Sequence, residues 1–199
     1  MPVQDVASRV VALSSMENRM LVNQLLMRKR PAMWMVLALF LLVPCIAHGG
    51  LPPQLEAALF AKILNYDKKI AAKPPAERQV LIVYIPKGSA NVREIQDAFT
   101  AARIPVTVAT TDEAAAKLPG VVAVYIADEK ISTALQQAIA GAGVLSLSGA
   151  ESLANTGSVS VGLTVRDNGR PEIIVHLGRL KAEGHELAAE LLALAKVIK

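Results

Sequence analysis

The stretch Val80-Leu81-Ile82-Val83-Tyr84-Ile85 is the part of this sequence that says most about the fold. A continuous apolar run rich in β-branched residues is typical of a strand that is buried on both faces of a sheet. Pro86 follows directly and ends the strand, because proline cannot donate to the hydrogen-bond ladder of a sheet. A second run of this kind, Val121 to Ile126, predicts another buried strand further along the chain.

Helical patterns alternate with strands on both sides of this run. Gln54 to Tyr66 has apolar residues at three- and four-residue spacing, which predicts a helix after the pair Pro52-Pro53. Helices are also predicted over 91–102, 112–118 and 132–140, and strands over 106–109, 121–126 and 144–147. Because strands that alternate with helices pair in parallel, we expect an α/β domain with a mostly parallel sheet and helices on both faces.

The last third of the chain changes to a hairpin pattern. Two apolar segments, 159–165 and 172–177, flank Asp167-Asn168-Gly169-Arg170, whose Asn-Gly pair favours positive φ and a tight turn. A short link over 178–183 then leads to a helix over 184–198, whose apolar stripe contains Leu187, Leu191, Leu194 and Ile198. The sequence predicts one domain over 50–199 that ends in this β-hairpin and a closing helix beside the first helix.

An export signal precedes this domain. Basic residues at 28–30, an apolar run over 32–46 and the small residues Ala47, Gly49 and Gly50 predict a secretory signal peptide over 27–49 that is cleaved near Gly50. The alternative is an inner-membrane anchor over 32–46, but a membrane span needs about 20 apolar residues. Residues 1–26 indicate either an additional leader or a true start at Met27. We therefore expect a periplasmic protein.

The composition of the exported part excludes some classes of function. The whole chain has a net charge of +4, but residues 1–49 hold five of the 21 basic and two of the 17 acidic residues. The remaining 16 basic and 15 acidic residues nearly balance, so nothing favours nucleic acid as a partner. The single cysteine, Cys45, falls inside the signal, and the mature domain therefore forms no disulfide.

The sequence shows no catalytic constellation, and we expect no enzyme, no metal and no cofactor. His176 and His185 lack the spacing of a zinc site. We expect His176 to cap the end of a strand and His185 to be exposed at the start of the last helix. A hydrolase that uses Ser146 or Ser148 with His176 is a further alternative, but the chain lacks the Gly-x-Ser-x-Gly turn around these serines.

A small-ligand site is another alternative, since parallel strands form ligand crevices outside their carboxyl ends. Segments 86–89, 128–130 and 148–151 follow three of the predicted strands. The candidate crevice residues are Pro86, Lys87, Gly88, Asp128, Ser148 and Gly149.

Three segments carry a resemblance to a known family. Phe60-Ala61-Lys62-Ile63-Leu64-Asn65-Tyr66 looks like a Phe-Ala-Lys-aromatic-Val-Glu-Trp helix, and the strands and helices in the middle fall in the same order. Near the end, the Asp167-Asn168-Gly169 turn, Glu172 to Leu177 and Gly184 to Lys196 follow the same closing pattern. In these features the chain resembles the YfiR family of small periplasmic regulatory proteins (YfiR/HmsC-like), over nearly all of 51–198.

The chain departs from the family at Tyr66, where Trp is usual, and at His176, where Asn is common. It also lacks the cysteines that bridge some members, which argues against redox sensing. The resemblance implies a non-enzymatic domain that binds the outward part of an inner-membrane diguanylate cyclase, holds it inactive and so lowers cyclic-di-GMP and biofilm formation. A sensor kinase or a transport component as the partner stays open, as does a homodimer.

Overall fold

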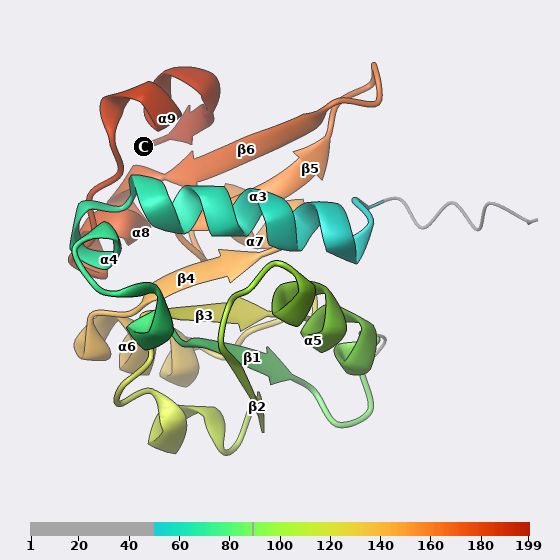
Figure 1. Ribbon diagram of the computed structural model, residues 1–199, viewed down its shortest axis with the longest axis vertical. Coiled ribbons are helices and arrows are strands. Elements are labelled where there is room, and N and C mark those ends of the chain that lie inside the picture. Colours follow the sequence, from blue (N-terminus) through green and yellow to red (C-terminus); the bar gives the residue numbers. More distant parts are fainter. Residues whose placement is uncertain (1–49, 89) are drawn as a thin grey trace, which may run out of the picture. The chain divides into compact units, whose positions relative to one another are not determined.

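The apolar run 80–85 forms strand β1 (Val80–Tyr84) inside the sheet. The computed structural model describes residues 50–88 and 90–199. In these residues β1 lies between β2 (Val106–Thr110) and β3 (Ala123–Ile126), both parallel to it. The sheet continues in parallel through β4 (Leu145–Ser148) and β5 (Val161–Val165). The α/β sheet predicted from the sequence is confirmed (Figure 1).

The predicted hairpin closes this series of strands. β6 (Pro171–His176) runs antiparallel to β5, and β7 (Lys196–Ile198) runs parallel to β6, so the order is β2-β1-β3-β4-β5-β6-β7 in the described residues. The Arg166 N–H donates to the Arg170 carbonyl across the loop at 2.9 Å. Gly169 adopts a φ of 76°, whereas Asn168 does not take positive φ. The loop is therefore a three-residue turn that ends in a left-handed glycine.

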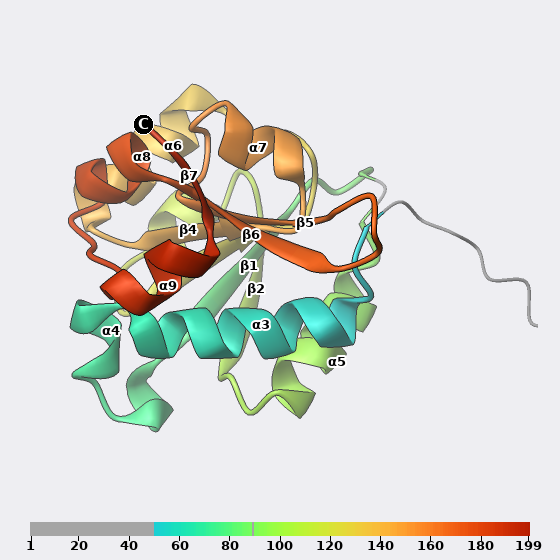
Figure 2. The same ribbon diagram turned by 90° about the horizontal axis from the view of Figure 1, so that it is seen from above.

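Helices cover both faces of the sheet, as predicted (Figure 2). α3 (Pro53–Tyr66) and α5 (Val92–Ala101) lie on one face, and α6 (Thr133–Ala142) and α7 (Glu151–Asn155) lie on the other. The aromatic residues of the first face form a cluster with ring centroids 5.1 to 6.3 Å apart, made of Phe60, Phe99 and Tyr125. Successive strand residues alternate between the two cores because their side chains point to opposite faces.

Shorter elements connect these layers and differ in part from the expectation. α4 (Lys68–Ala71) and the 3₁₀ turn η2 (Pro75–Glu77) lead from α3 to β1. The helix predicted over 112–118 is the 3₁₀ turn η3 (Ala114–Lys117). The predicted link over 178–183 is instead helical and forms α8 (Leu177–Ala182). Its N-cap is His176, whose Nδ1 accepts from the Arg179 N–H at 3.1 Å, so this histidine at the end of β6 caps a helix that was not predicted.

The closing helix is shorter than predicted. Within 184–198, only α9 (Ala189–Leu194) is helical, and the chain becomes extended at Ala195 to form β7. The spacing of the leucines suggested a longer helix, but the edge of β6 offers backbone hydrogen bonds to residues 196–198, and this tertiary pairing overrides the local pattern. The segment before α9 meets the end of α3, where the Ala188 N–H donates to the Tyr66 carbonyl.

The predicted leader over 1–26, the signal peptide over 27–49, the cleavage positions Ala47 and Gly49 and the alternative anchor over 32–46 lie outside the described residues; Gly50 is the first described. In residues 50–88 and 90–199, none of the helices has both the length and the apolar character that crossing a membrane requires.

Candidate functional site

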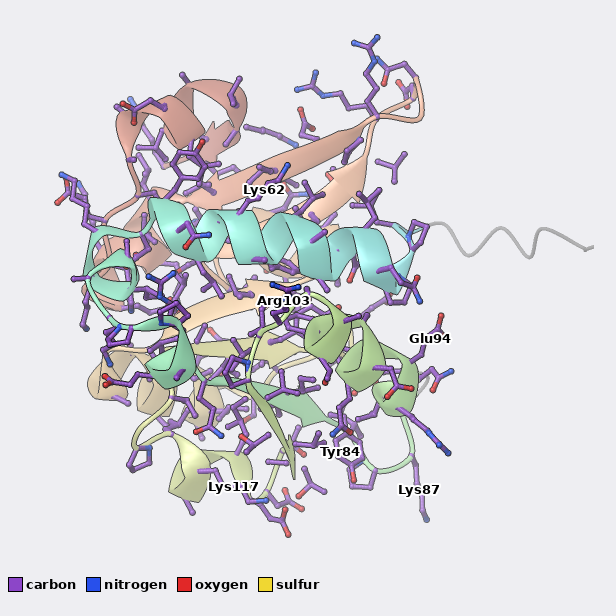
Figure 3. The ribbon with its side chains drawn as sticks, in the orientation of Figure 1. Lys62, Tyr84, Lys87, Glu94, Arg103 and Lys117 are labelled. Carbon is purple, nitrogen blue, oxygen red and sulfur yellow. The ribbon has the colours of Figure 1, made fainter. Side chains whose placement is uncertain are left out.

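The carboxyl ends of the parallel strands bring the predicted crevice segments to one edge of the sheet. The chain passes from β1 to β2 on one side and to β3 on the other, so the strand order reverses between β1 and β3. Ligands of open α/β sheets bind outside such a reversal point. Pro86, Lys87 and Gly88 follow β1 there and are exposed; Figure 3 shows Lys87 on the loop beyond Tyr84.

Asp128 joins the two loops at this point. Its side chain is only 6% exposed, and Oδ2 accepts a hydrogen bond from the Ile85 N–H at 2.7 Å. A Cβ at Gly88 would lie well inside 3.0 Å of the same carboxylate, so the loop can pass this closely only because residue 88 is glycine. Asp128 therefore fixes the loop after β1 to the end of β3.

Ser148 and Gly149 form the next part of this edge. The Ser148 hydroxyl donates to the Ile126 carbonyl at 2.9 Å and accepts from the Ala150 N–H at 3.0 Å, so it stabilises the turn after β4. Gly149 packs against the Glu56 carboxylate, and a Cβ at this position would again lie inside 3.0 Å of it. The turn thus depends on a small residue beside a buried acid.

Glu56 stands at this edge in the first turn of α3 and is 7% exposed. Tyr125 donates its hydroxyl to Glu56 Oε2 at 2.8 Å. Burial raises the pKa of the Glu56 carboxyl, and the hydrogen bond from Tyr125 partly offsets this rise. Burial, and then the charge and hydrogen bonding of Glu56, raise the pKa of Tyr125 well above its ordinary value. Sequence reasoning missed Glu56, since an acid in a first helical turn is usually exposed.

A pocket of about 680 Å³ opens beside these residues, and we call it the carboxyl-edge pocket. Glu151 on its wall accepts from Thr164 Oγ1 at 2.7 Å and from Asn155 Nδ2 at 3.0 Å. These hydrogen bonds, with Lys196 nearby, lower the pKa of the Glu151 carboxyl. The wall thus carries the carboxylates of Glu129 and Glu151, and Lys196 pairs with Glu151 at 3.7 Å. The lining residues are Gly50, Glu129, Gly149, Ala150, Glu151, Ser152, Asn155, Leu163 and Thr164.

The serines and histidines of the hydrolase alternative have other partners. Ser146 is fully buried and donates its hydroxyl to Glu183, while Ser148 donates to a carbonyl. The ring of His176 caps α8 and lies against Gly157. Among the residues that the structure describes, no hydrogen bond joins either serine to a histidine. The same residues contain no group of three or more His, Cys, Asp or Glu side chains placed to hold a metal ion.

The expectation that His185 is exposed is wrong. His185 is 6% exposed, its Nδ1 lies 2.9 Å from Asp67 Oδ2, and its Nε2 lies 3.1 Å from the Gly143 carbonyl. Both acceptors belong to segments far from residue 185 in the sequence. The imidazole therefore ties the chain before α9 to the ends of α3 and α6.

Glu183 is the centre of a second buried hydrogen-bond network, which the sequence did not predict. Its carboxylate accepts from the Ser146 N–H at 2.9 Å, from the hydroxyls of Ser146 and Ser160, and from Arg179 Nε at 2.7 Å. Arg179 also donates to the Gln136 carbonyl. Because each acceptor oxygen receives two hydrogen bonds, the buried charge is well compensated. This network fixes α8 to β4 and to the start of β5.

Comparisons with known proteins agree with this architecture. The sequence profile of a family described as YfiR/HmsC-like matches residues 53–196. No curated protein matches the chain. One similar solved structure is a conserved domain protein from Vibrio cholerae O1 biovar eltor str. N16961, with 14% identity and a TM-score of 0.55 over 74% of this chain. Another is the ABC domain from Streptococcus pneumonia in complex with L-Trp, with 11% identity and a TM-score of 0.52 over 74% of this chain. The chain spans 60% of the length of each, and at these identities the likeness concerns the fold alone.

Proposed function

Because the chain belongs to the YfiR/HmsC-like family, we propose that it is a non-enzymatic periplasmic regulator that binds and restrains an inner-membrane signalling protein. The partner we favour is a diguanylate cyclase, whose inhibition lowers cyclic-di-GMP and biofilm formation. The observation that carries this proposal is the family match over 53–196, which spans the α/β domain from α3 to the first residue of β7.

Two features of the chain support the proposal. The export signal predicted over 27–49 would deliver the domain to the compartment where the outward parts of inner-membrane proteins lie. The hydrogen bonds of Ser146, Ser148, His176 and His185 go to groups that hold the fold together, so these side chains are not arranged for attack on a substrate. Binding is the mode of action that such a domain supports.

The test is deletion of the gene with measurement of cyclic-di-GMP by mass spectrometry. We expect the level to rise in the deletion strain and to return when the full chain is restored. A matched chain that lacks residues 27–49 should fold but should not restore it, because it stays on the wrong side of the membrane. Unchanged cyclic-di-GMP in the deletion strain would exclude the cyclase as the partner.

A direct binding test completes this experiment. The purified domain is added to membranes that contain the candidate cyclase, and cyclic-di-GMP synthesis is followed as the amount of domain increases. Saturable inhibition is expected. Synthesis that does not change, although the domain is folded, would contradict restraint of that cyclase.

The carboxyl-edge pocket favours a second function, a small-ligand sensor. Its volume of about 680 Å³ is in the range of small-molecule sites, and it lies outside parallel strand ends. One structure with a similar fold, the ABC domain from Streptococcus pneumonia, was solved in complex with L-Trp. Thermal-shift measurements with amino acids and amines test this function: a ligand should raise Tm in the wild type and less in Glu151→Gln. A screen without any rise would argue against it.

A further inference from the structure

A second pocket, of about 190 Å³, lies at the opposite edge of the sheet, before the amino ends of β1 and β2. We call it the amino-edge pocket. Six of its nine lining residues are apolar, and its polar side chains are Asn65, Arg78 and Arg103. The size suits a ligand much smaller than a typical drug molecule. The other lining residues are Ala61, Leu64, Pro75, Ala102, Ile104 and Pro105.

Arg78 is held rigidly at one wall of this pocket. Its Nε donates to the Lys73 carbonyl at 2.8 Å, one terminal nitrogen donates to the Ala71 carbonyl at 3.0 Å, and the other donates to Asn65 Oδ1. All three acceptors are neutral, so the guanidinium charge is not cancelled by them. A guanidinium has five N–H donors, and two remain for a ligand.

Arg103 faces the pocket from an unusual backbone conformation. It follows the end of α5 with a φ of 61°, and no other non-glycine residue among 50–88 and 90–199 has positive φ. The Arg103 and Ile104 N–H groups donate to the Thr100 and Phe99 carbonyls and close the helix end in the way that normally takes glycine. An arginine here costs stability that glycine would not. Residues in such sparsely populated backbone conformations cluster at functional sites.

The two arginines make the amino-edge pocket positive. None of the ion pairs found among the described residues includes Arg78 or Arg103. Figure 3 shows the Arg103 side chain in the space between α3 and α5, and residues of α3 line the same pocket. Guanidinium groups match the oxygen pairs of carboxylates and phosphates in shape as well as charge.

From this geometry we infer that the amino-edge pocket binds a small organic anion, with its carboxylate or phosphate on Arg78 and Arg103 and an apolar body against Leu64 and Ile104. This site is separate from the carboxyl-edge pocket and does not depend on the proposed partner. The ligand class is an oxyanion on a compact apolar group.

Arg103→Gly is the decisive variant because the two roles of the residue predict opposite changes. Glycine relieves the backbone, so Tm should rise by about 2 °C or more. The same variant should bind the anion at least about tenfold more weakly, since a hydrogen bond to a charged group is worth this much. Lys62→Ala is the matched control: it removes one exposed charge from α3 but does not line the pocket.

The probes are benzoate and inorganic phosphate, with benzamide as the neutral partner of benzoate, titrated at constant ionic strength and followed by NMR shifts of residues 61–65 and 102–105. We expect the wild type and Lys62→Ala to bind an anion and not benzamide. Binding of benzoate but not phosphate would make the apolar body part of recognition; binding of both would place recognition in the oxyanion. The inference is overturned if neither anion binds to the wild type. It is also overturned if Arg103→Gly, or Arg103→Asn as a second variant, binds as tightly as the wild type, because the arginines would then serve only the helix ends.

Discussion

Glu183→Gln is the substitution for which the structure predicts the largest loss of stability. The carboxylate is fully buried, Oε1 accepts from Ser146 Oγ and Arg179 Nε, and Oε2 accepts from the Ser146 N–H and Ser160 Oγ. An amide keeps one acceptor oxygen and presents donors at the other position. In one orientation the Arg179 Nε–H then faces an NH₂ group, and in the other the Ser146 backbone N–H does. Neither group can reverse its role.

Two estimates of the cost agree. In either orientation the N–H donor that faces the NH₂ group loses its hydrogen bond to a charged group, worth about 1.5–3 kcal/mol, and the remaining bonds weaken because the amide carries no charge. Removal of one partner from a buried ion pair costs about 3–5 kcal/mol. We therefore expect the free energy of unfolding to fall by about 3–5 kcal/mol, which is a large part of the stability of an ordinary domain.

Urea unfolding followed by far-UV circular dichroism measures this loss. Glu186→Gln is the matched control, because it makes the same chemical change in a side chain that is 71% exposed and pairs with Lys68 at the surface. A surface pair of this kind contributes about 0–1 kcal/mol. If the two variants lost the same small amount, the buried network would not stabilise the fold, and the reasoning from burial would be refuted.

Three further predictions concern other buried polar groups and the close packing around them. Burial raises the pKa of Glu56 in the folded protein above its ordinary value of 4.5, so below pH 4.5 the carboxyl is protonated in both the folded and the unfolded protein. As pH rises from there through the folded pKa, the unfolded protein loses this proton first, and the free energy of unfolding of the wild type falls. Glu56→Gln should abolish this fall, and urea unfolding at several pH values measures it. Gly149→Ala should cost about 1–3 kcal/mol because its Cβ displaces the Glu56 carboxylate, and the cost should shrink in the Gly149→Ala/Glu56→Ala double variant. His185→Ala leaves buried Asp67 without its partner and should lower the free energy of unfolding by about 1–3 kcal/mol, whereas an unchanged urea midpoint would show that the pair is dispensable.

The sequence predicted the part of the fold that local patterns specify. The apolar runs at 80–85 and 121–126 are buried parallel strands, and the Asp167-Asn168-Gly169 loop closes a hairpin. These elements follow from residue types within a few positions, which is the range that periodicity and turn chemistry describe. The last strand, β7, has no such local origin, because residues 196–198 are extended only where they pair with β6.

Of the six crevice residues named from the sequence, only Gly149 lines the carboxyl-edge pocket. The predicted segments after β1, β3 and β4 do meet at one edge of the sheet, because parallel strands place their carboxyl ends together. The buried acid beside Gly149 comes from α3, far earlier in the chain, and nothing near Glu56 in the sequence signals burial. The same holds for His185, whose partner Asp67 is 118 residues away.

The buried polar interactions all depend on the C-terminal third of the chain, and this connects the fold with the proposed export. The Asp67–His185 pair, the Glu183 network and the backbone bond from Ala188 to Tyr66 all join the C-terminal third to earlier parts of the chain. None of them can form before residues 183–188 are present, so the first helix and β4 lack these partners until the chain is nearly complete. A protein that crosses a membrane as an extended chain gains from such late closure, because early folding would hinder its passage. The same charges would be costly in an incomplete core, and they are compensated only when the whole domain is present.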